Sequence, residues 1–227
     1  MELSKKFPTF YSKDAVEINK ARIDHFNSLK LSIRKKTILE TGCGAKGDFT
    51  KNLLDRGAKV TVMDARKYIV NGIKEKYKVD GFTANLNYEN SVKGIYDFIF
   101  CYGTLYHLSS PIQALKQLSK SCKEGIIIST CITHNESEFV FENENDPTQS
   151  VDGLGFRPTR KWVMNELSNY FDYVYVSRTQ PNHPEFPTEW GGKYKTECIR
   201  AVFIGSHRPL RPKIWSPTLL QKQKIFN

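Results

Sequence analysis

The sequence contains no run of 18 consecutive apolar residues, which a helix needs to cross a bilayer, so no membrane-spanning helix is expected. Residues 1–8 are polar and basic and lack the apolar stretch of a secretory signal. The five cysteines are an odd number without C-x-x-C pairs, which argues against a disulfide framework or a zinc knuckle. Together these absences predict a cytoplasmic protein with free thiols.

Metal-binding spacing is also lacking. A histidine and a glutamate lie close together in His134-Asn135-Glu136 and in His183-Pro184-Glu185. Neither spacing places two ligands on one face of a helix, as a helical metal pair requires. We therefore expect no metal ion.

Acidic residues are missing from the C-terminal end of the chain. Residues 206–227 hold five Lys and Arg and no acid, and residues 1–36 hold nine against four. These two ends account for the whole net charge of +10, so the body between them is neutral. A duplex-binding enzyme more often carries its basic residues on the catalytic face. We interpret the basic ends as solubilising, partly mobile termini, with a nucleic-acid-binding arm as the alternative.

One stretch combines the signals of a strand, a tight turn and a helix. The apolar run that begins at Ile38 leads into a G-x-G-x-x-G pattern, and the residues after it have apolar side chains at helical spacing. The glycines are Gly42, Gly44 and Gly47. Their missing side chains let the backbone approach a bound cofactor closely. Asp64 ends the next apolar strand, where an acid can bind a ribose diol. This context predicts a nucleotide-like cofactor rather than a plain turn.

The remaining sequence alternates strand and helix patterns. We expect strands over residues 37–40, 59–63, 79–83, 96–101, 126–132, 171–177 and 198–204. We expect helices over residues 12–31, 48–56, 67–77, 111–121 and 160–170, the third interrupted or begun late at Asn71-Gly72. The alternation predicts an α/β fold with a doubly wound, mostly parallel seven-stranded sheet and helices on both faces. The last connection has no helix, so the last strand is expected to be antiparallel.

We expect a single domain over residues 1–227. Residues 1–36 form a helical extension that packs on the sheet or closes over the cofactor, residues 37–205 form the core, and residues 206–227 form a basic tail. The polar segment 133–159 is expected to be irregular, as a functional or a disordered loop.

This pattern resembles the class I S-adenosylmethionine-dependent methyltransferases, which have a Rossmann-like fold. The resemblance covers residues 37–132 by motif and extends to residue 205 by strand count. The residues that carry it are Leu39-Glu40-Thr41-Gly42-Cys43-Gly44, Asp64, and Tyr96-Asp97-Phe98-Ile99 leading to Leu105-Tyr106-His107-Leu108. It implies S-adenosylmethionine as the cofactor. The glycine loop would hold its methionine part, Asp64 its ribose and Asn85 its adenine. The family often has Asp at this third place, but the Asn85 amide can also hydrogen-bond an adenine edge.

Charge separates this cofactor from a pyridine dinucleotide. Asp48 sits at the start of the expected helix, where a pyrophosphate would otherwise bind, and Glu40 also disfavours phosphate. Glu40 would instead favour the ammonium and sulfonium groups of S-adenosylmethionine. An NAD(P)-dependent oxidoreductase is the alternative. The cofactor-binding residues that we expect are Glu40, Thr41, Gly42, Cys43, Gly44, Gly47, Asp64, Ala65, Asn85, Leu86 and Tyr102.

The loops that follow parallel strands lie over one edge of the sheet, so they supply the catalytic candidates. The candidate bases are His107, which can also contact the substrate, and His134. His183 is a candidate for a substrate contact and less so for a base, and each of the three can instead be a structural histidine. The candidate clamps for a carboxylate or phosphate on the substrate are Arg157, Arg160 and Arg178, with capping and surface pairing as the alternative.

The residues that follow the fourth expected strand bear on the class of acceptor. In the resembled family an Asn-Pro-Pro-Tyr-like element there accompanies attack on amino groups of bases and glutamine, and Cys101-Tyr102-Gly103-Thr104 stands in its place. We therefore expect a small-molecule acceptor, with O-methylation preferred. An RNA methyltransferase that uses the basic ends and a cofactor-binding scaffold without catalysis are the alternatives.

Overall fold

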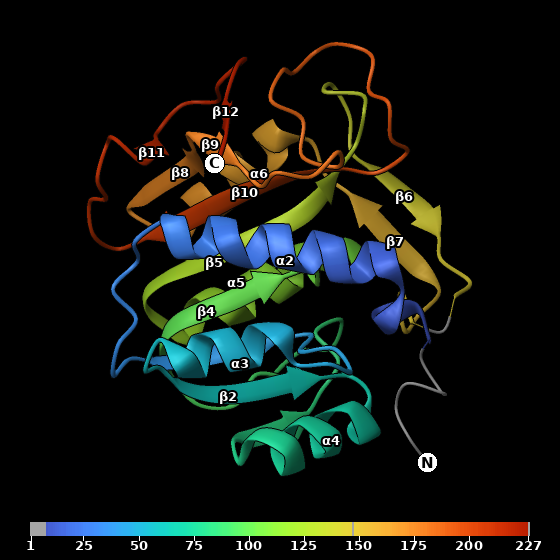
Figure 1. The fold of residues 1–227 in the computed structure, drawn as a ribbon, viewed down its shortest axis with the longest axis vertical. Coiled ribbons are helices and arrows are strands. Elements are labelled where there is room, and N and C mark those ends of the chain that lie inside the picture. Colours follow the sequence, from blue (N-terminus) through green and yellow to red (C-terminus); the bar gives the residue numbers. More distant parts are fainter. Residues whose placement is uncertain (1–7, 147, 227) are drawn as a thin grey trace.

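In the computed structural model, which describes residues 8–146 and 148–226, a twisted sheet runs through the middle of the molecule (Figure 1). Residues 1–7 of the expected helical extension lie outside the described residues. The strands of this sheet lie in the order β11-β8-β10-β5-β4-β1-β2-β3. They are β1 (Thr37–Thr41), β2 (Lys59–Asp64), β3 (Asp80–Thr83), β4 (Tyr96–Tyr102), β5 (Cys122–Ile132), β8 (Tyr173–Ser177), β10 (Ile199–Ser206) and β11 (Trp215–Ser216).

The strand directions confirm the expected topology. β1 pairs in parallel with β2 and β4, and β4 pairs in parallel with β5. β10 enters between β5 and β8 and is antiparallel to both, as the helix-less last connection predicts. The sheet has eight strands rather than seven, because β11 adds an antiparallel edge strand beside β8.

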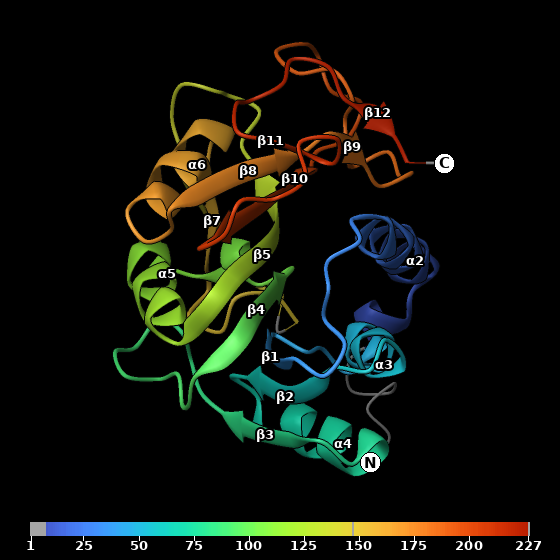
Figure 2. The same ribbon diagram turned by 90° about the vertical axis from the view of Figure 1, so that its left-hand side faces the viewer.

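Helices cover both faces of the sheet (Figure 2). One face carries α2 (Lys13–Ser28), α3 (Asp48–Asp55) and α4 (Lys67–Tyr77), and the other carries α5 (Pro111–Lys120) and α6 (Arg160–Ser168). Two 3-10 helices, η1 (Pro8–Tyr11) and η2 (Leu105–His107), lie before α2 and after β4. α4 runs unbroken through Asn71-Gly72, so the expected interruption is wrong. Burial of Ile69, Val70 and Ile73 on one side of α4 outweighs the low helix propensity of glycine.

The two faces bury separate cores. Side chains alternate along a strand, and in β4 Phe98, Phe100 and Tyr102 pack with the helices α2, α3 and α4. Ile99 and Cys101 pack on the opposite side with α5 and α6. This double burial explains the continuous apolar sequence of β4.

α2 presents an unusual face to the sheet. Its N-cap is Ser12, whose side chain accepts a hydrogen bond from the Ala15 backbone N–H at 3.2 Å. The buried residues of the helix are Ile18, Arg22, His25 and Phe26, which follow helical spacing. One guanidinium and one imidazole therefore face the interior.

The polar segment 133–159 contains a short hairpin that the sequence did not predict, and its other described residues are irregular, as expected. β6 (Val140–Asn143) and β7 (Leu154–Arg157) pair antiparallel, with Phe141 opposite Phe156. The rings of this pair have centroids 5.1 Å apart. Cross-strand aromatic contact stabilises two strands that are too short to show a clear alternation in the sequence.

The C-terminal segment packs on the body, so the expectation of a mobile tail is wrong for its described residues. Trp215 of β11 is 1% exposed, and β12 (Lys224–Ile225) pairs with β9 (Thr179–Gln180). The Trp190 indole Nε1–H donates to Gln223 Oε1 at 2.6 Å. Within residues 8–146 and 148–226, no helix is both long enough and apolar enough to span a bilayer.

Replacement of Trp215 by alanine should destabilise the whole fold. The change leaves a cavity at the sheet edge, and truncation of a buried Trp costs about 3–5 kcal/mol of unfolding free energy. Urea denaturation measures this loss, and the matched control is Lys213→Ala on an exposed position, with an expected change within about 0.5 kcal/mol. Equal midpoints for both variants would show that the segment does not belong to the cooperative unit.

Candidate functional site

A cavity of about 450 Å³ opens at the carboxyl ends of the central strands. In the sheet, β2 lies on one side of β1 and β4 lies on the other. The loops that follow β1 and β4 therefore run in opposite directions from the carboxyl ends of these two strands. The cavity is lined by the loops after β1, β2, β3 and β4, by η1 and α2, and by residues 148–151. Its size is within the range of ordinary small-ligand sites.

The glycine loop forms one wall of the cavity and requires bare backbone. Gly42, Gly44 and Gly47 have φ angles of 62°, 63° and 65°, which favour glycine. A Cβ atom on Gly42 would lie 2.4 Å from the Thr104 hydroxyl oxygen. The Thr104 hydroxyl donates to the Thr41 carbonyl at 2.7 Å, so the tips of β1 and β4 touch at this glycine. Cys43 also lines the cavity.

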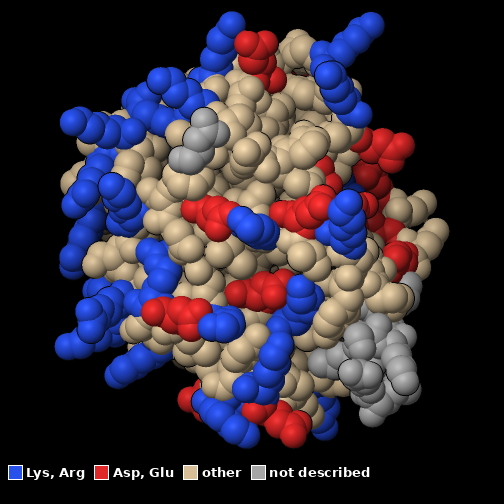
Figure 3. Space-filling view, in the orientation of Figure 1, with Lys and Arg blue, Asp and Glu red and all other residues tan. Residues whose placement is uncertain are grey.

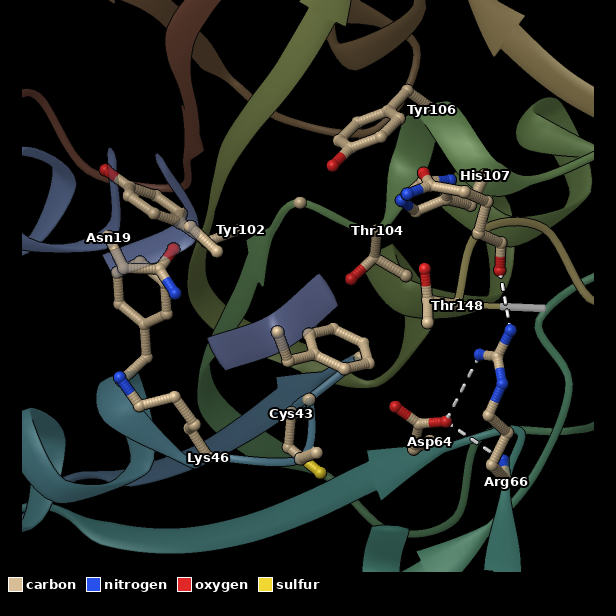
Figure 4. A pocket seen from close by; sticks show the side chains of 18 of the residues that line it. Asn19, Cys43, Lys46, Asp64, Arg66, Tyr102, Thr104, Tyr106, His107 and Thr148 are labelled. Atoms are coloured by element: carbon tan, nitrogen blue, oxygen red, sulfur yellow. Dashed lines mark hydrogen bonds and ion pairs between the residues drawn. The ribbon is translucent and has the colours of Figure 1, made fainter. Parts of the chain in front are cut away.

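Asp64 lies at the end of β2 with its carboxylate at the cavity (Figure 4). It accepts a hydrogen bond from the Arg66 backbone N–H at 2.9 Å, and the Arg66 Nη1 atom is 3.8 Å away. Burial raises the pKa of the Asp64 carboxyl, although backbone N–H groups, among them those of Gly44 and Ala65, oppose the shift. Arg66 also donates from Nη2 to the Gln149 carbonyl at 2.7 Å, which ties this corner to the hairpin.

The residues after β3 line the same cavity. Asn85 donates from its amide to Asp152 Oδ1 at 3.2 Å, and its Oδ1 accepts from the Asn87 backbone N–H at 3.0 Å. Leu86 is 3% exposed and completes this wall. Ala65, after Asp64, and Tyr102, at the end of β4, also line the cavity. Nine of the eleven expected cofactor-binding residues are thus brought together.

Glu40 and Thr41 are the two that do not line the cavity. Glu40 is 2% exposed and accepts a hydrogen bond from the Thr50 hydroxyl of α3 at 2.6 Å. Burial raises the pKa of its carboxyl to about 8, so it is mostly uncharged at neutral pH. The structure therefore turns Glu40 toward α3 instead of toward a cofactor cation, and Thr41 contributes its backbone carbonyl to Thr104.

Of the three candidate histidines, only His107 lines the cavity. Its Nδ1 lies 2.7 Å from Glu144 Oε2. Burial opposes ionisation of Glu144, but hydrogen bonds from His107 and Arg157 outweigh it and lower the Glu144 pKa to about 2. Burial lowers the pKa of His107 despite that contact. Near neutral pH a neutral His107 donates from Nδ1 to a carboxylate and keeps a lone pair on Nε2.

His134 and His183 do not line the cavity. His134 is exposed and lies against the Tyr194 ring, with centroids 5.2 Å apart. His183 accepts from the Glu185 backbone N–H through Nδ1 at 3.3 Å, as a turn histidine does.

The three arginines expected to clamp an anion already have protein partners. Arg157 pairs with Glu144 at 2.8 Å, Arg160 pairs with Glu136 at 2.6 Å, and Arg178 donates to the Pro212 carbonyl at 2.6 Å. None of the three lines the cavity.

Besides Arg66 after β2, two arginines that sequence reasoning missed line the cavity, Arg22 of α2 and Arg200 of β10. Arg200 donates from Nε to Glu185 Oε2 at 2.5 Å, while its Nη1 is buried without a hydrogen-bond partner among the described residues. Arg22 lies four residues after Ile18 on the buried side of its helix, and Arg200 stands between Ile199 and Ala201 in an apolar strand. A charged residue among apolar ones is the sequence signal by which both could have been noticed.

These residues fit S-adenosylmethionine. The left-handed glycine loop leaves room for a close approach, and the carboxylate of Asp64 suits a pair of ribose hydroxyls. Over residues 8–146 and 148–226, no group of three His, Cys, Asp or Glu side chains is placed to hold a metal ion.

The raised pKa of Glu40 predicts a pH-dependent stability difference. Between pH 4.5, the ordinary value, and about pH 8 the folded state binds more protons at Glu40 than the unfolded state, so stability falls as pH rises. Glu40→Gln removes this effect and keeps an acceptor for Thr50. As pH rises across this window, the free energy of unfolding of the variant should increase relative to that of the unmodified protein by up to about 1.4 kcal/mol per pH unit. Urea unfolding at pH 5 and pH 8 measures the gain, and a difference that stays constant with pH would contradict it.

Comparisons with known proteins agree with this geometry. The family model of a methyltransferase domain matches residues 17–172. A tRNA U34 carboxymethyltransferase of Campylobacter fetus is 27% identical over 73% of this chain and 62% of its own length, so the chain spans less than two thirds of that relative. One of Wolinella succinogenes is 36% identical over 42% of this chain and 36% of its own length.

Solved structures share the fold. The N-terminal domain of EvdMO1, solved with S-adenosylhomocysteine and D-fucose, has a TM-score of 0.60 and 18% identity over 87% of this chain and 84% of its own. A possible histamine N-methyltransferase of Thermotoga maritima also has a TM-score of 0.60, with 16% identity over 90% and 98%. The matched domain covers most of the chain, and the fold is that of the methyltransferase structures above. The protein belongs to the class I S-adenosylmethionine-dependent methyltransferases.

Proposed function

We propose that this protein transfers the methyl group of S-adenosylmethionine to an oxygen atom of a small-molecule acceptor, with His107 as the general base. The observation that carries this proposal is the pairing of His107 with Glu144 beside the same cavity as the glycine loop. When bound, the cofactor supplies an electrophilic methyl group on a sulfonium. The protein must hold the acceptor in line with it and remove the hydroxyl proton.

The His107–Glu144 pair suits proton removal. Glu144 is ionised at any pH above about 2, so it holds the imidazole with Nδ1 protonated. Nε2 is then the basic atom, and a hydroxyl within hydrogen-bond reach of it can lose its proton as the new bond forms. The carboxylate also stabilises the imidazolium that results.

The distribution of surface charge supports a small acceptor. In Figure 3 the Lys and Arg side chains gather along the left-hand side, where the parallel strands begin in Figure 1. That end carries Arg34 and Lys35 before β1, Lys59 in β2, and Arg208 and Arg211 after β10. The carboxyl ends and the cavity lie on the other side. On the face shown in Figure 3, this group of Lys and Arg side chains therefore lies away from the cavity, where it would not contact a polyanion bound at the cavity.

Replacement of His107 by glutamine should lower kcat by about 10²- to 10⁴-fold, because the acceptor proton then has no base. Affinity for S-adenosylhomocysteine, measured by calorimetry, should stay unchanged. In the unmodified protein kcat/KM should fall as pH drops through the lowered pKa of His107. Transfer from radiolabelled S-adenosylmethionine to the low-molecular-mass fraction of a cell extract is the assay, and His134→Gln is the matched control. Equal turnover in both variants would remove His107 from this role.

A second candidate function follows from the names of the relatives, which act on tRNA U34 as carboxymethyltransferases. A carboxymethyl group differs from a methyl group by a carboxylate, so its donor would need a cation near the transferred carbon. Arg200 offers one, since its Nη1 has no hydrogen-bond partner in the described part of the chain and its guanidinium lies 4.8 Å from the Tyr106 ring centroid. This observation favours carboxymethyl transfer to a wobble uridine as the alternative.

Incubation of tRNA with S-adenosylmethionine, and in parallel with an analogue that carries a carboxylate on the transferred carbon, separates the two functions. Under the small-molecule proposal, mass spectrometry of digested tRNA shows no adduct even at low salt, where non-specific electrostatic binding is strongest. A carboxymethyl adduct on uridine that is lost in Arg200→Met would establish the second function. A methyl adduct on tRNA would keep methyl transfer and replace the acceptor class.

A further inference from the structure

The guanidinium of Arg22 lacks the partners that a buried cation needs. The residue is 6% exposed and lines the cavity. Its Nη1 donates to Asn19 Oδ1 at 3.2 Å, but its Nε and Nη2 are buried without a hydrogen-bond partner among the described residues. No ion pair found within residues 8–146 and 148–226 includes Arg22.

This arrangement is costly for the protein alone. Burial, with a smaller contribution from the charge of Arg200, lowers the pKa of Arg22 to about 10, so the group stays protonated at neutral pH. A buried charge without a counter-ion is strongly unfavourable. Arg200 has Glu185 as its counter-ion, whereas Arg22 has none of its own. Among the described residues no anion faces this guanidinium, and a ligand that carries a carboxylate would supply one.

The structure holds the guanidinium firmly in place. Its Cζ lies 5.0 Å from the Phe49 ring centroid and 5.3 Å from the Tyr102 ring centroid. A Cβ atom on Gly103 would lie 3.1 Å from Nη2, so glycine leaves the space beside this donor. The two unpaired atoms, Nε and Nη2, form the edge of a guanidinium that binds a carboxylate through two parallel hydrogen bonds.

The strand order indicates which carboxylate of a bound ligand would reach Arg22. Along the cavity edge, Asn85 follows β3, Asp64 ends β2, Gly42 follows β1, and Gly103 follows β4 beneath Arg22. A cofactor with its adenine near Asn85 and its ribose at Asp64 therefore directs its amino-acid end toward β4. We propose that Arg22 binds the α-carboxylate of S-adenosylmethionine through Nε and Nη2, an inference that rests on the proposed placement of the cofactor in this cavity.

Calorimetric titration with two ligands tests the assignment. S-adenosylhomocysteine carries the carboxylate, and its decarboxylated analogue keeps the adenosine, the sulfur and the amine. Arg22→Met should weaken S-adenosylhomocysteine binding by about 10- to 100-fold, the loss expected for charge-assisted hydrogen bonds. The analogue should bind the variant and the unmodified protein equally. The melting temperature without ligand should stay level or rise, because the variant removes an uncompensated buried charge.

Two further variants keep the outcome clear. Arg22→Lys should restore part of the affinity, since a point charge replaces the two-pronged donor. Arg56→Met is the matched control, because Arg56 also packs on an aromatic ring, at 4.6 Å from the Phe26 centroid, but does not line the cavity. Equal weakening of both ligands by Arg22→Met, or no weakening of either, would overturn the assignment of Arg22. Failure of the unmodified protein to bind either ligand would instead overturn the placement of the cofactor, and the assignment with it.

Discussion

The contact between the tips of β1 and β4 is the constraint on which the site depends. The Thr104 hydroxyl donates to the Thr41 carbonyl at the position where a side chain on Gly42 would collide with it. The parallel pairing of β1 with β4 brings these two loops to the same edge. The loops after β1 and β4 then run in opposite directions. A cavity therefore opens beside the backbone of Gly42, which carries no side chain. The cavity that we propose for the cofactor is thus a consequence of sheet topology and one absent side chain.

Buried charge is distributed unevenly around this cavity. Glu40 is protonated against α3, whereas Glu144 is ionised between His107 and Arg157. Arg200 has a counter-ion, whereas Arg22 has none in the part of the chain that the structure describes. A fold selected only for stability would pair or replace such a cation. The arrangement is explained by a ligand that brings negative charge at one end and a ribose at the other, which describes the donor of this family.

Much of the fold and of the cofactor site was predictable from local sequence signals. The glycine spacing, the apolar strands and the acid at the end of β2 are short-range patterns, and the structure brings Gly42, Asp64 and Asn85 to one cavity as they imply. Arg22 and Arg200 escaped prediction because an arginine among apolar residues does not by itself show that its guanidinium faces a cavity; that depends on the packing of α2 and β10 against the other elements. The β6–β7 hairpin and the buried Trp215 depend on long-range contacts, which periodicity does not report. The choice among three histidines likewise needed the position of Glu144, 37 residues from His107 in the sequence.

We expect the cavity at the carboxyl ends of β1, β2, β3 and β4 to hold an adenosyl donor that lies along the strand order β3-β2-β1-β4. A crystal structure of the protein with S-adenosylhomocysteine tests it most directly. The account predicts ribose hydroxyls on the Asp64 carboxylate, adenine beside Asn85 and Leu86, and the amino-acid end over Gly42. A ligand with its ribose away from Asp64, or bound outside this cavity, would contradict it.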